Sequence, residues 1–431
     1  MRDRDSEGSG LETSRPLRVL YVMHTPAASG AGLSLRYLIE HFPPGAVVAT
    51  ALCPPGPIVD QLRAAGVQVL PIPGVSMFHS AEGISLRGLR LLELLRTVWH
   101  MRYSAVIRRA IAQVRPDVVH LNDRGMLHAA RIARRAGVPV VMHARSVADS
   151  ATPWVGRVSA ALVPRYVDRV IAIDESVRRS LRGLPNVDVI YNPYPVPSGP
   201  PGLEVNGRHS AGASAVVRVT YLTGLLTFKG IWDLLEAARL LRDRHDIQFL
   251  VAGGNSRPEA FHRSLAGRLA HLFGFAPDVE SAVRAWVERH GLGTTVRLLG
   301  QVDHVEDVLR QSDILAFPSH LNGPGRAVFE AGIHGIPAIV ALKDRVEDVV
   351  EDGVTGLIVP PRDPRRLADA IMRLADDPVM RRRLGSAARS RYAAQFEPAA
   401  AARRMLQVYR ELLSSGPPSG VTMPLARAIR R

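Results

Sequence analysis

The chain has 431 residues, 46% hydrophobic and 22% charged, and this composition excludes disordered, collagen-like and small disulfide-stapled proteins. Its length suits two or three domains of ordinary size. Cys53 is the single cysteine, which excludes an internal disulfide and a cysteine-based metal site. The net charge is +15, with Lys229 and Lys343 as the only lysines, and this surplus favours anionic partners. Aromatic residues make up only 5%, with no recognisable nucleic-acid-binding module, so we expect no nucleic acid partner.

The chain shows no segment that would carry it across a membrane. No apolar run reaches the roughly 18 residues of a spanning helix, and the start MRDRDSEGSG lacks the apolar stretch of a signal peptide. We therefore expect a cytoplasmic protein. Any membrane attachment should be peripheral, at the inner membrane face. Residues 86–114 interleave apolar and arginine side chains, which fits an interfacial helix as well as an ordinary domain helix. Residues 261–275 predict an inserted helix that covers the sheet or docks on a membrane or partner.

Short apolar runs rich in β-branched residues alternate with amphipathic helical stretches, and this pattern occurs twice. In the first half we expect strands at 18–23, 46–52, 67–72, 118–121, 138–143, 169–173 and 187–191. In the second half we expect strands at 218–222, 248–252, 296–300, 314–317, 337–341 and 356–359. The alternation predicts an α/β fold with two doubly wound Rossmann-like domains.

A stretch dense in Pro, Gly and Ser separates these halves and predicts a linker. We expect an N-terminal domain over 1–195, a linker over 196–214 and a C-terminal domain over 215–395. A helix within 396–431 completes the N-terminal domain in this scheme. Because open α/β sheets bind ligands outside the carboxyl ends of their strands, the two domains should face each other across a ligand cleft.

The first expected strand leads into a glycine-containing loop. Gly30 and Gly32 stand just before a helix that we expect to begin near Leu33. Glycines let backbone amides approach a phosphate, and a helix N-terminus adds partial positive charge. The alternative is a turn that only needs flexible residues. The third glycine of the dinucleotide fingerprint is missing, which disfavours a dehydrogenase.

A similar loop follows the strand at 218–222. Gly224 permits a tight turn, Lys229 ends the loop, and Gly230 opens an amphipathic helix. A lysine at this place can pair as a point charge with a diphosphate. A solvated surface lysine is the alternative.

The segment FPSHLNGPGRAVFEAGIHGIPAIV, residues 317–340, carries the most specific pattern. A strand ends, Asn322, Gly325 and Arg326 follow in a loop, and a helix begins near Ala327. Glycines at a helix N-terminus form an anion cradle, to which Arg326 adds a counter-charge. Glu330 lies one turn into that helix, where it either accepts the two hydroxyls of a ribose or simply complements the helix dipole.

The order of these motifs, followed by VEDVVEDGVTGLIVPPRDPRRLADAI at 346–371, resembles the GT-B-fold retaining glycosyltransferases of family four. The resemblance runs from about residue 18 to residue 413. It implies that Gly30, Gly32 and Lys229 hold the diphosphate of a UDP-, GDP- or other nucleoside diphosphate sugar, and that Glu330 binds its ribose. It also implies sugar transfer with retention of configuration, without a metal or separate cofactor.

The acceptor side is less specific. His120 and His143 end adjacent expected strands, so each is a candidate to contact the donor sugar or to orient the acceptor hydroxyl, or a structural hydrogen-bonding group. Asn122, Asp123 and Arg145 are further candidates for acceptor contacts. We expect a lipid-linked, polysaccharide or small-molecule acceptor, consistent with polysaccharide biosynthesis.

Two positions depart from the family pattern. Asn322 replaces the first acid of the Glu-x7-Glu signature, and Leu225 replaces an arginine of the phosphate loop. We hypothesise that Arg326 takes over phosphate neutralisation while Asn322 bonds a sugar hydroxyl. The alternatives are a non-catalytic nucleotide-sugar-binding subunit and a nucleotide-sugar epimerase. The lost acid counts against the epimerase, which needs acidic residues near the sugar.

Overall fold

The computed structural model describes most of the chain. The described residues are 15–28, 30–75, 99, 101–147, 153–181, 183–196, 216–255, 259–265, 267–268, 277–302, 304–321, 323, 325–343, 348 and 350–415. Asn322, most of the expected linker, and parts of the stretches 86–114 and 261–275 lie outside these residues. In the part of the chain that is described, no helix is both long and apolar enough to cross a membrane.

Seven parallel strands form the sheet of the first half. They are β1 (Leu17–Val22), β2 (Val47–Cys53), β3 (Gln68–Pro71), β4 (Val118–Leu121), β5 (Val140–Ala144), β6 (Arg169–Ala172) and β7 (Val187–Val189). Their order across the sheet is β3-β2-β1-β4-β5-β6-β7. The winding direction reverses between β1 and β4, which is the position where such sheets bind ligands.

Six parallel strands form the sheet of the second half. They are β8 (Val217–Leu222), β9 (Ile247–Ala252), β10 (Val296–Gly300), β11 (Ile314–Phe317), β12 (Ala338–Ala341) and β13 (Gly356–Val359). Their order is β10-β9-β8-β11-β12-β13, so the reversal lies between β8 and β11. Two doubly wound parallel sheets confirm the fold class expected from the sequence, and each strand boundary lies within two residues of its expected position.

Helices cover both faces of the first sheet, and every residue of its central strands β4 and β5 is buried, as in parallel sheets covered on two sides. On one face lie α4 (Ser104–Val114), α5 (Leu127–Arg135), α6 (Pro153–Tyr166) and α7 (Glu175–Ser180). On the other lie α1 (Gly30–Glu40), α2 (Ile58–Ala64) and α16 (Pro398–Ser414). Helix α4 shows the local reason: its buried residues Ile107, Ala110, Ile111 and Val114 recur at helical spacing.

The second sheet is covered in the same way. Helices α8 (Ile231–Leu240), α11 (Val279–Arg289) and α14 (Pro364–Asp376) pack on one face. Helices α12 (Val305–Leu309), α13 (Arg326–Ile333) and α15 (Pro378–Gln395) pack on the other. The short elements η1 (Met101–Tyr103), η2 (Thr227–Lys229) and α9 (Glu259–Arg263) complete the described helices.

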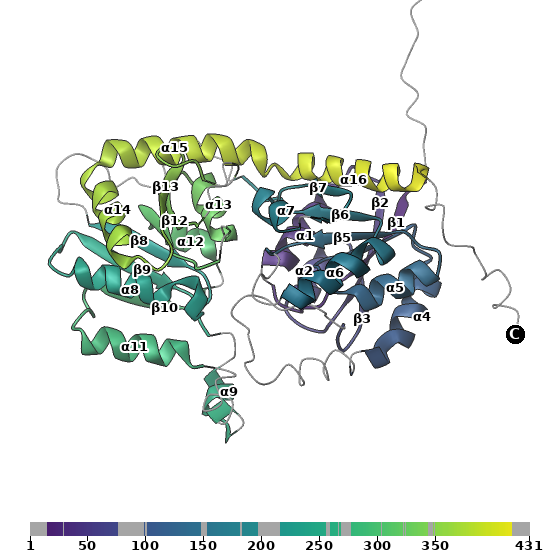
Figure 1. The fold of residues 1–431 in the computed structure, drawn as a ribbon, viewed down its shortest axis with the longest axis horizontal. Coiled ribbons are helices and arrows are strands. Elements are labelled where there is room, and N and C mark those ends of the chain that lie inside the picture. The colour runs from purple at the N-terminus through teal and green to yellow at the C-terminus, as the bar shows by residue number, and fades with distance from the viewer. Residues whose placement is uncertain are drawn as a thin grey trace, which may run out of the picture.

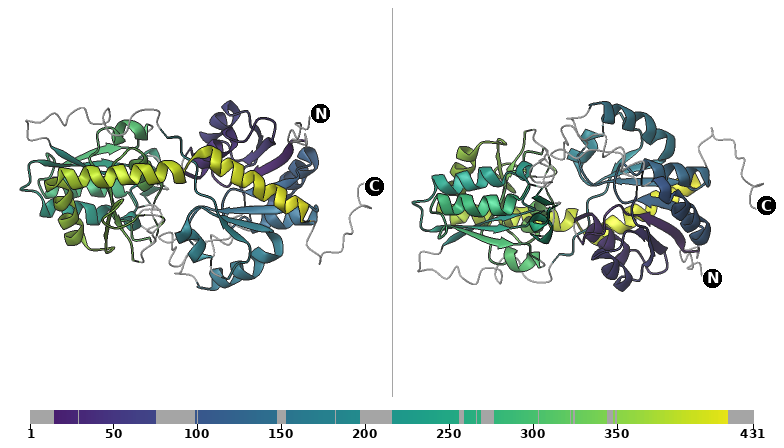
Figure 2. Two further views of the ribbon diagram at one scale, coloured as in Figure 1. Left: turned by 90° about the horizontal axis from the view of Figure 1, so that it is seen from above. Right: turned by 90° about the horizontal axis from the view of Figure 1, so that it is seen from below.

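The last two helices connect the halves. Helix α15 packs on the second half, and α16 continues from it along the first half (Figure 1). Figure 2 shows from above that the pair runs along both halves of the molecule. Met405 and Tyr409 of α16 are fully buried against β1, so this C-terminal helix forms part of the core of the first half.

Candidate functional site

The residues that the sequence singled out lie mostly at the two reversal points. Those in α1 and those after β4 belong to the first half, and those after β8 and β11 belong to the second. Contacts between α1 and α13 bring these two edges together, as shown below. The topology therefore places the candidate site between the two sheets.

Helix α1 begins at Gly30, so the expectation that both glycines precede the helix is wrong. Both lie in its first turn, where the helical backbone tolerates glycine, and at Gly32 the packing is too close for a larger residue. A Cβ at Gly32 would lie 3.0 Å from the Ala27 carbonyl oxygen and from Ile58. A Cβ at Gly30 would lie 3.8 Å from Cδ of Arg326. The start of α1 is thus in contact with the second half.

The loop after β8 holds a cation between aromatic rings. Gly224 is exposed, and Gly230 adopts a φ of 77° where a Cβ would lie 1.9 Å from the Pro318 carbonyl oxygen. Lys229 Nζ lies 5.5 Å from the ring centre of Phe317. Desolvation lowers the pKa of Lys229. Among the residues that the structure describes, no carboxylate forms an ion pair with this ammonium, so it is placed to receive an anionic ligand.

Helix α13 begins immediately after β11 and its loop. Gly325 is the N-cap residue, and a Cβ there would lie 2.5 Å from Cζ of Phe317. Only glycine fits between this ring and the helix start. The first amides of α13 therefore remain close to Lys229, with Phe317 contacting both. Asn322, the proposed sugar ligand of this loop, lies outside the described residues.

Arg326 and Glu330 contact each other. The Arg326 guanidinium forms a short ion pair with the Glu330 carboxylate one turn further along α13. Its Nη1 also donates to the Gly30 carbonyl oxygen and to Ser34 Oγ, both at 3.2 Å. Arg326 therefore links α13 to α1 across the two halves.

Sequence reasoning missed this pairing, although the spacing of four residues on a helix is a signal for it. It also missed Ser34 and Tyr194, whose positions no motif marks. Tyr194 places its ring centre 5.3 Å from the Arg326 guanidinium carbon. A small cavity of about 30 Å³ lies at this junction, and its lining includes Ser34, Tyr194, Arg326 and Glu330.

The two candidate histidines are buried rather than open to the junction. His120 is 0% exposed and His143 1% exposed. A hydrogen bond of 2.7 Å joins His120 Nδ1 to the Tyr409 hydroxyl of α16. Burial lowers the pKa of His120 to about 3 and that of His143 well below its ordinary value, so both rings are neutral. Their direct contact with a sugar stays a prediction.

The acceptor candidates Asn122 and Arg145 form one cluster. Arg145 follows β5, and its Nε and Nη2 donate to Asn122 Oδ1 at 2.9 and 2.7 Å. Its Nη1 donates to Asn192 Oδ1 at 2.6 Å. Asn192 lines the same small cavity as Arg326. Asp123 points elsewhere, since one of its carboxylate oxygens accepts from the Arg124 amide at 2.7 Å and the other lies 3.9 Å from His24.

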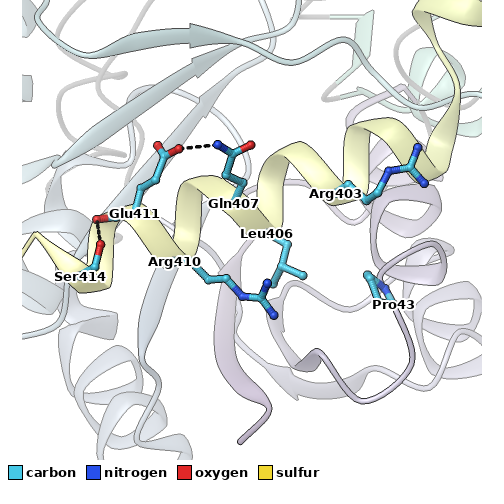
Figure 3. A pocket seen from close by; sticks show the side chains of 7 residues that line it. All are labelled: Pro43, Arg403, Leu406, Gln407, Arg410, Glu411 and Ser414. Atoms are coloured by element: carbon cyan, nitrogen blue, oxygen red, sulfur yellow. Dashed lines mark hydrogen bonds between the residues drawn. The ribbon is translucent and has the colours of Figure 1, made fainter. Parts of the chain in front are cut away.

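A second hollow lies between α16 and Pro43 of the loop after α1, and it is separate from this junction. It has a volume of about 480 Å³ and is lined by Pro43, Arg403, Leu406, Gln407, Arg410, Glu411 and Ser414. Figure 3 shows Leu406 and Arg410 pointing from α16 toward Pro43. None of the residues singled out from the sequence lines it.

Comparison with known families matches both halves. Residues 217–391 match the model described as glycosyl transferases group 1, and residues 57–196 match the model of glycosyltransferase family 4.

Curated relatives carry names of glycosyl-transferring enzymes. Alpha-D-kanosaminyltransferase of Streptomyces kanamyceticus is 29% identical over 198 residues, which is 45% of this chain and 45% of that protein. Glycogen synthase of Mycobacterium tuberculosis is 26% identical over 68% of this chain and 69% of its own length. The D-inositol 3-phosphate glycosyltransferase of Mycolicibacterium vanbaalenii is 29% identical over 64% of each chain. This chain thus spans between about half and two thirds of these relatives.

Solved structures share the fold along almost the whole chain. HepE of Anabaena, in complex with UDP and glucose, superposes with a TM-score of 0.69 at 19% identity, covering 91% of this chain and 99% of HepE. Sucrose-phosphate synthase of Thermosynechococcus elongatus gives 0.69 at 19% identity, covering 93% and 100%. With two facing doubly wound sheets and family models matched on both, the chain belongs to the GT-B-fold glycosyltransferases of family four.

Proposed function

We propose that this protein transfers a sugar from a nucleoside diphosphate sugar to an acceptor hydroxyl, with retention of configuration at the anomeric carbon. The observation that carries the proposal is the position of Lys229: a desolvated ammonium without a carboxylate partner in the described part of the chain, next to the start of α13. HepE, which shares the fold, was solved with UDP and glucose, and this supports the same class of donor.

The reaction breaks the bond between the anomeric carbon and the diphosphate, so negative charge grows on the leaving group. Fixed cations and helix N-termini stabilise that charge most effectively where water is excluded. Lys229 and the first amides of α1 and α13 are suited to this task. Retention requires the acceptor oxygen to attack from the face that the diphosphate leaves. The nearest base for the acceptor proton is then an oxygen of the leaving diphosphate itself.

Donor binding requires the Arg326–Glu330 pair to change partners. The sequence assigns Arg326 to the diphosphate and Glu330 to the ribose. In the structure, however, the two side chains form an ion pair with each other. A diphosphate offers Arg326 a stronger counter-charge than one carboxylate, and this frees Glu330 to accept from the ribose hydroxyls. The exchange also releases the Arg326 contacts to Gly30 and Ser34, so donor binding and the contact between the halves are coupled.

The donor assignment is tested by comparing the binding of UDP and uridine by calorimetry. Lys229→Ala and Arg326→Ala should each weaken UDP binding by about tenfold or more, because each loses a diphosphate contact. Uridine lacks the phosphates, so Lys229→Ala should leave its binding nearly unchanged, and Arg326→Ala should not weaken it, because Glu330 is then free for the ribose. Lys343→Ala is the matched control, since Lys343 is the other lysine of the chain and is exposed. Equal UDP affinity in Lys229→Ala and Lys343→Ala would remove the proposed diphosphate site.

We also propose that the first half docks on an anionic membrane surface, as a lipid-linked acceptor would require. Trp99 is 60% exposed, and the Arg102 guanidinium carbon lies 3.7 Å above its ring. Arg108 and Arg109 of the neighbouring α4 are exposed as well. An exposed tryptophan among arginines is suited to an interface with anionic headgroups.

Vesicle co-sedimentation tests this surface. Wild type should bind vesicles that contain phosphatidylglycerol and not vesicles of phosphatidylcholine alone, and binding should fall as salt rises. The double substitution Trp99→Ala with Arg102→Gln should weaken the binding several-fold. Equal binding to both vesicle types, or no effect of the double substitution, would contradict the docking proposal and leave the donor assignment intact.

A further inference from the structure

Arg145 is a partly buried cation, and all the hydrogen bonds that it makes within the described residues go to neutral groups. Its partners are the side-chain oxygens of Asn122 and Asn192, the Asn122 carbonyl oxygen at 3.1 Å and, at 3.4 Å, Nδ1 of His143. His143 is itself neutral. Among the described residues, Arg145 forms no ion pair with a carboxylate. A desolvated guanidinium without a counter-ion destabilises the folded state, so a functional reason is needed for an arginine at this position.

The electrostatic surroundings of Arg145 favour an added anion. Burial lowers the pKa of Arg145 to about 10; the Asp123 carboxylate opposes this shift, and repulsion by Arg326 of the other half adds to it. Asp123 makes its hydrogen bond and its nearest charge contact to other groups. Two arginines from opposite halves therefore repel each other across the junction, and within the described residues Glu330 is the one carboxylate that forms an ion pair with either of them. An oxyanion bound at Arg145 would relieve both the missing counter-charge and this repulsion.

The cluster also fixes the guanidinium in place. Asn122 follows β4, Arg145 follows β5 and Asn192 follows β7, so three strand ends of one sheet hold it from different sides. Asn122 is held in turn, because its Nδ2 donates to the Ala31 carbonyl oxygen of α1 at 3.2 Å. Arginine has five N–H donors and these contacts use four of them, so one Nη1 N–H and the positive charge remain to bind a carboxylate or phosphate oxygen.

We propose that Arg145 binds a second oxyanion, separate from the donor diphosphate: a phosphate or carboxylate group carried by the acceptor or by the transferred sugar. This inference rests on the proposed function, because it places the group on the acceptor side of a bound donor. The diphosphate already has Lys229, Arg326 and two helix N-termini in that proposal. Arg145 belongs to the first half, at the strand ends next to the reversal point between β1 and β4.

The experiment uses inorganic phosphate as the probe, on the full chain saturated with UDP. Thermal stability is measured while phosphate replaces chloride at constant ionic strength. Wild type should be stabilised by phosphate even though UDP fills the donor site. Arg145→Gln should raise the apparent Kd for phosphate by about tenfold or more, while its UDP affinity changes less than twofold. Arg145→Lys, which keeps the charge and loses the asparagine contacts that fix the guanidinium, should give an intermediate value.

The control is Arg165→Gln, an exposed arginine of α6 in the same half, which should leave the phosphate response unchanged. A purely structural role for Arg145 predicts lower stability in Arg145→Gln with the phosphate response intact, and that result would overturn the inference. Loss of the wild-type phosphate response on adding UDP would also overturn it, because phosphate would then be occupying the diphosphate site. Should Arg145→Gln fail to fold, Arg145→Lys decides: an unchanged phosphate affinity contradicts the proposal.

Two donors distinguish the sources of the anion. If the transferred sugar carries it, wild type should bind UDP-glucuronate about tenfold more tightly than UDP-glucose, and Arg145→Gln should remove this difference. If the acceptor carries it, the two donors should bind alike and phosphate should still stabilise the protein with either one bound. Failure of UDP itself to bind would instead contradict the proposed function.

Discussion

Asp174 is a buried carboxyl at the boundary between the two halves. It is 2% exposed and accepts from the Val177 amide at 2.7 Å as the N-cap of α7. Asp348 of the second half reaches the same helix start, where it accepts from the Glu175 amide at 2.9 Å. Burial, offset by the Val177 amide and reinforced by the Asp348 charge, raises the pKa of Asp174 to about 6.

This shift predicts a pH-dependent stability. Because the pKa of Asp174 is higher in the folded state than its ordinary value of 3.8, the folded state holds the proton to higher pH. The stabilisation is present at low pH and is lost as pH rises from about 4 to about 6. Relative to Asp174→Asn, which keeps the cap acceptor, wild type should lose about 2 kcal/mol of unfolding free energy between pH 4.5 and 7.5. Urea unfolding at both pH values checks this, and a difference that does not vary with pH would contradict it.

His120 shows which residue contacts a single sequence conceals. Its place at the end of β4 follows from the apolar run before it, and so does the inference that it lies near a strand edge. Its partner Tyr409 is 289 residues away in α16, and no spacing or motif connects the two. Tyr409 Oη also lies 3.4 Å from the Tyr21 hydroxyl of β1, so three segments of the chain meet at one buried polar group.

Among the elements, α13 and α15 approach each other through glycines. A Cβ at Gly385 of α15 would lie 1.9 Å from the Gly335 carbonyl oxygen, just after α13. This backbone contact helps to hold α13, and with it Arg326 and Glu330, in position.

The packing predicts a strong effect at one glycine and a weak effect at another. Gly385→Ala should lower the unfolding free energy by about 3 kcal/mol or prevent folding, because the rigid Gly335 backbone cannot move aside. Gly293→Ala should change it by less than about 1 kcal/mol, since nothing lies within 4 Å of that Cβ position and its φ is not positive. Urea denaturation of both variants measures the difference, and equal stabilities would contradict this account of the contact.

The sequence predicts most of the strands and helices, because their periodicities are local. Every expected strand is present, and the loops after β8 and β11 carry their glycines and cations where the pattern placed them. The start of α1 was predicted three residues too late, since glycine in a first helical turn has no distinguishing local signal. The Arg326 contacts to Gly30 and Ser34 could not be predicted, because they depend on how two separately folded sheets face each other.

In the whole molecule, the stability of the first half depends on α16, which follows the second half in the chain. Its residues Ala402, Met405, Val408 and Tyr409 are fully buried in the core of the first half. A chain that ends at residue 396 keeps all of the second half but uncovers the part of the first sheet that α16 covers beside α1 and α2. The lost burial exceeds what a domain of ordinary stability can tolerate.

Limited proteolysis of this shortened chain tests the dependence. Fragments from residues 217–391 should persist, whereas the region 15–196 should be cleaved much faster than in the full chain. The full chain at the same protease concentration is the control. Equal resistance of the first half in both chains would show that α16 contributes little to it.

Helix α16 also affects how chimeras of related enzymes can be built. The two family models end at residues 196 and 391, so both leave α16 out, although it is built into the unit matched by the first model. Exchanging the two halves between related enzymes at one boundary near residue 200 would combine the first half of one protein with the α16 of another. A functional chimera must therefore exchange its front portion and its last helix as a matched set, with two junctions instead of one.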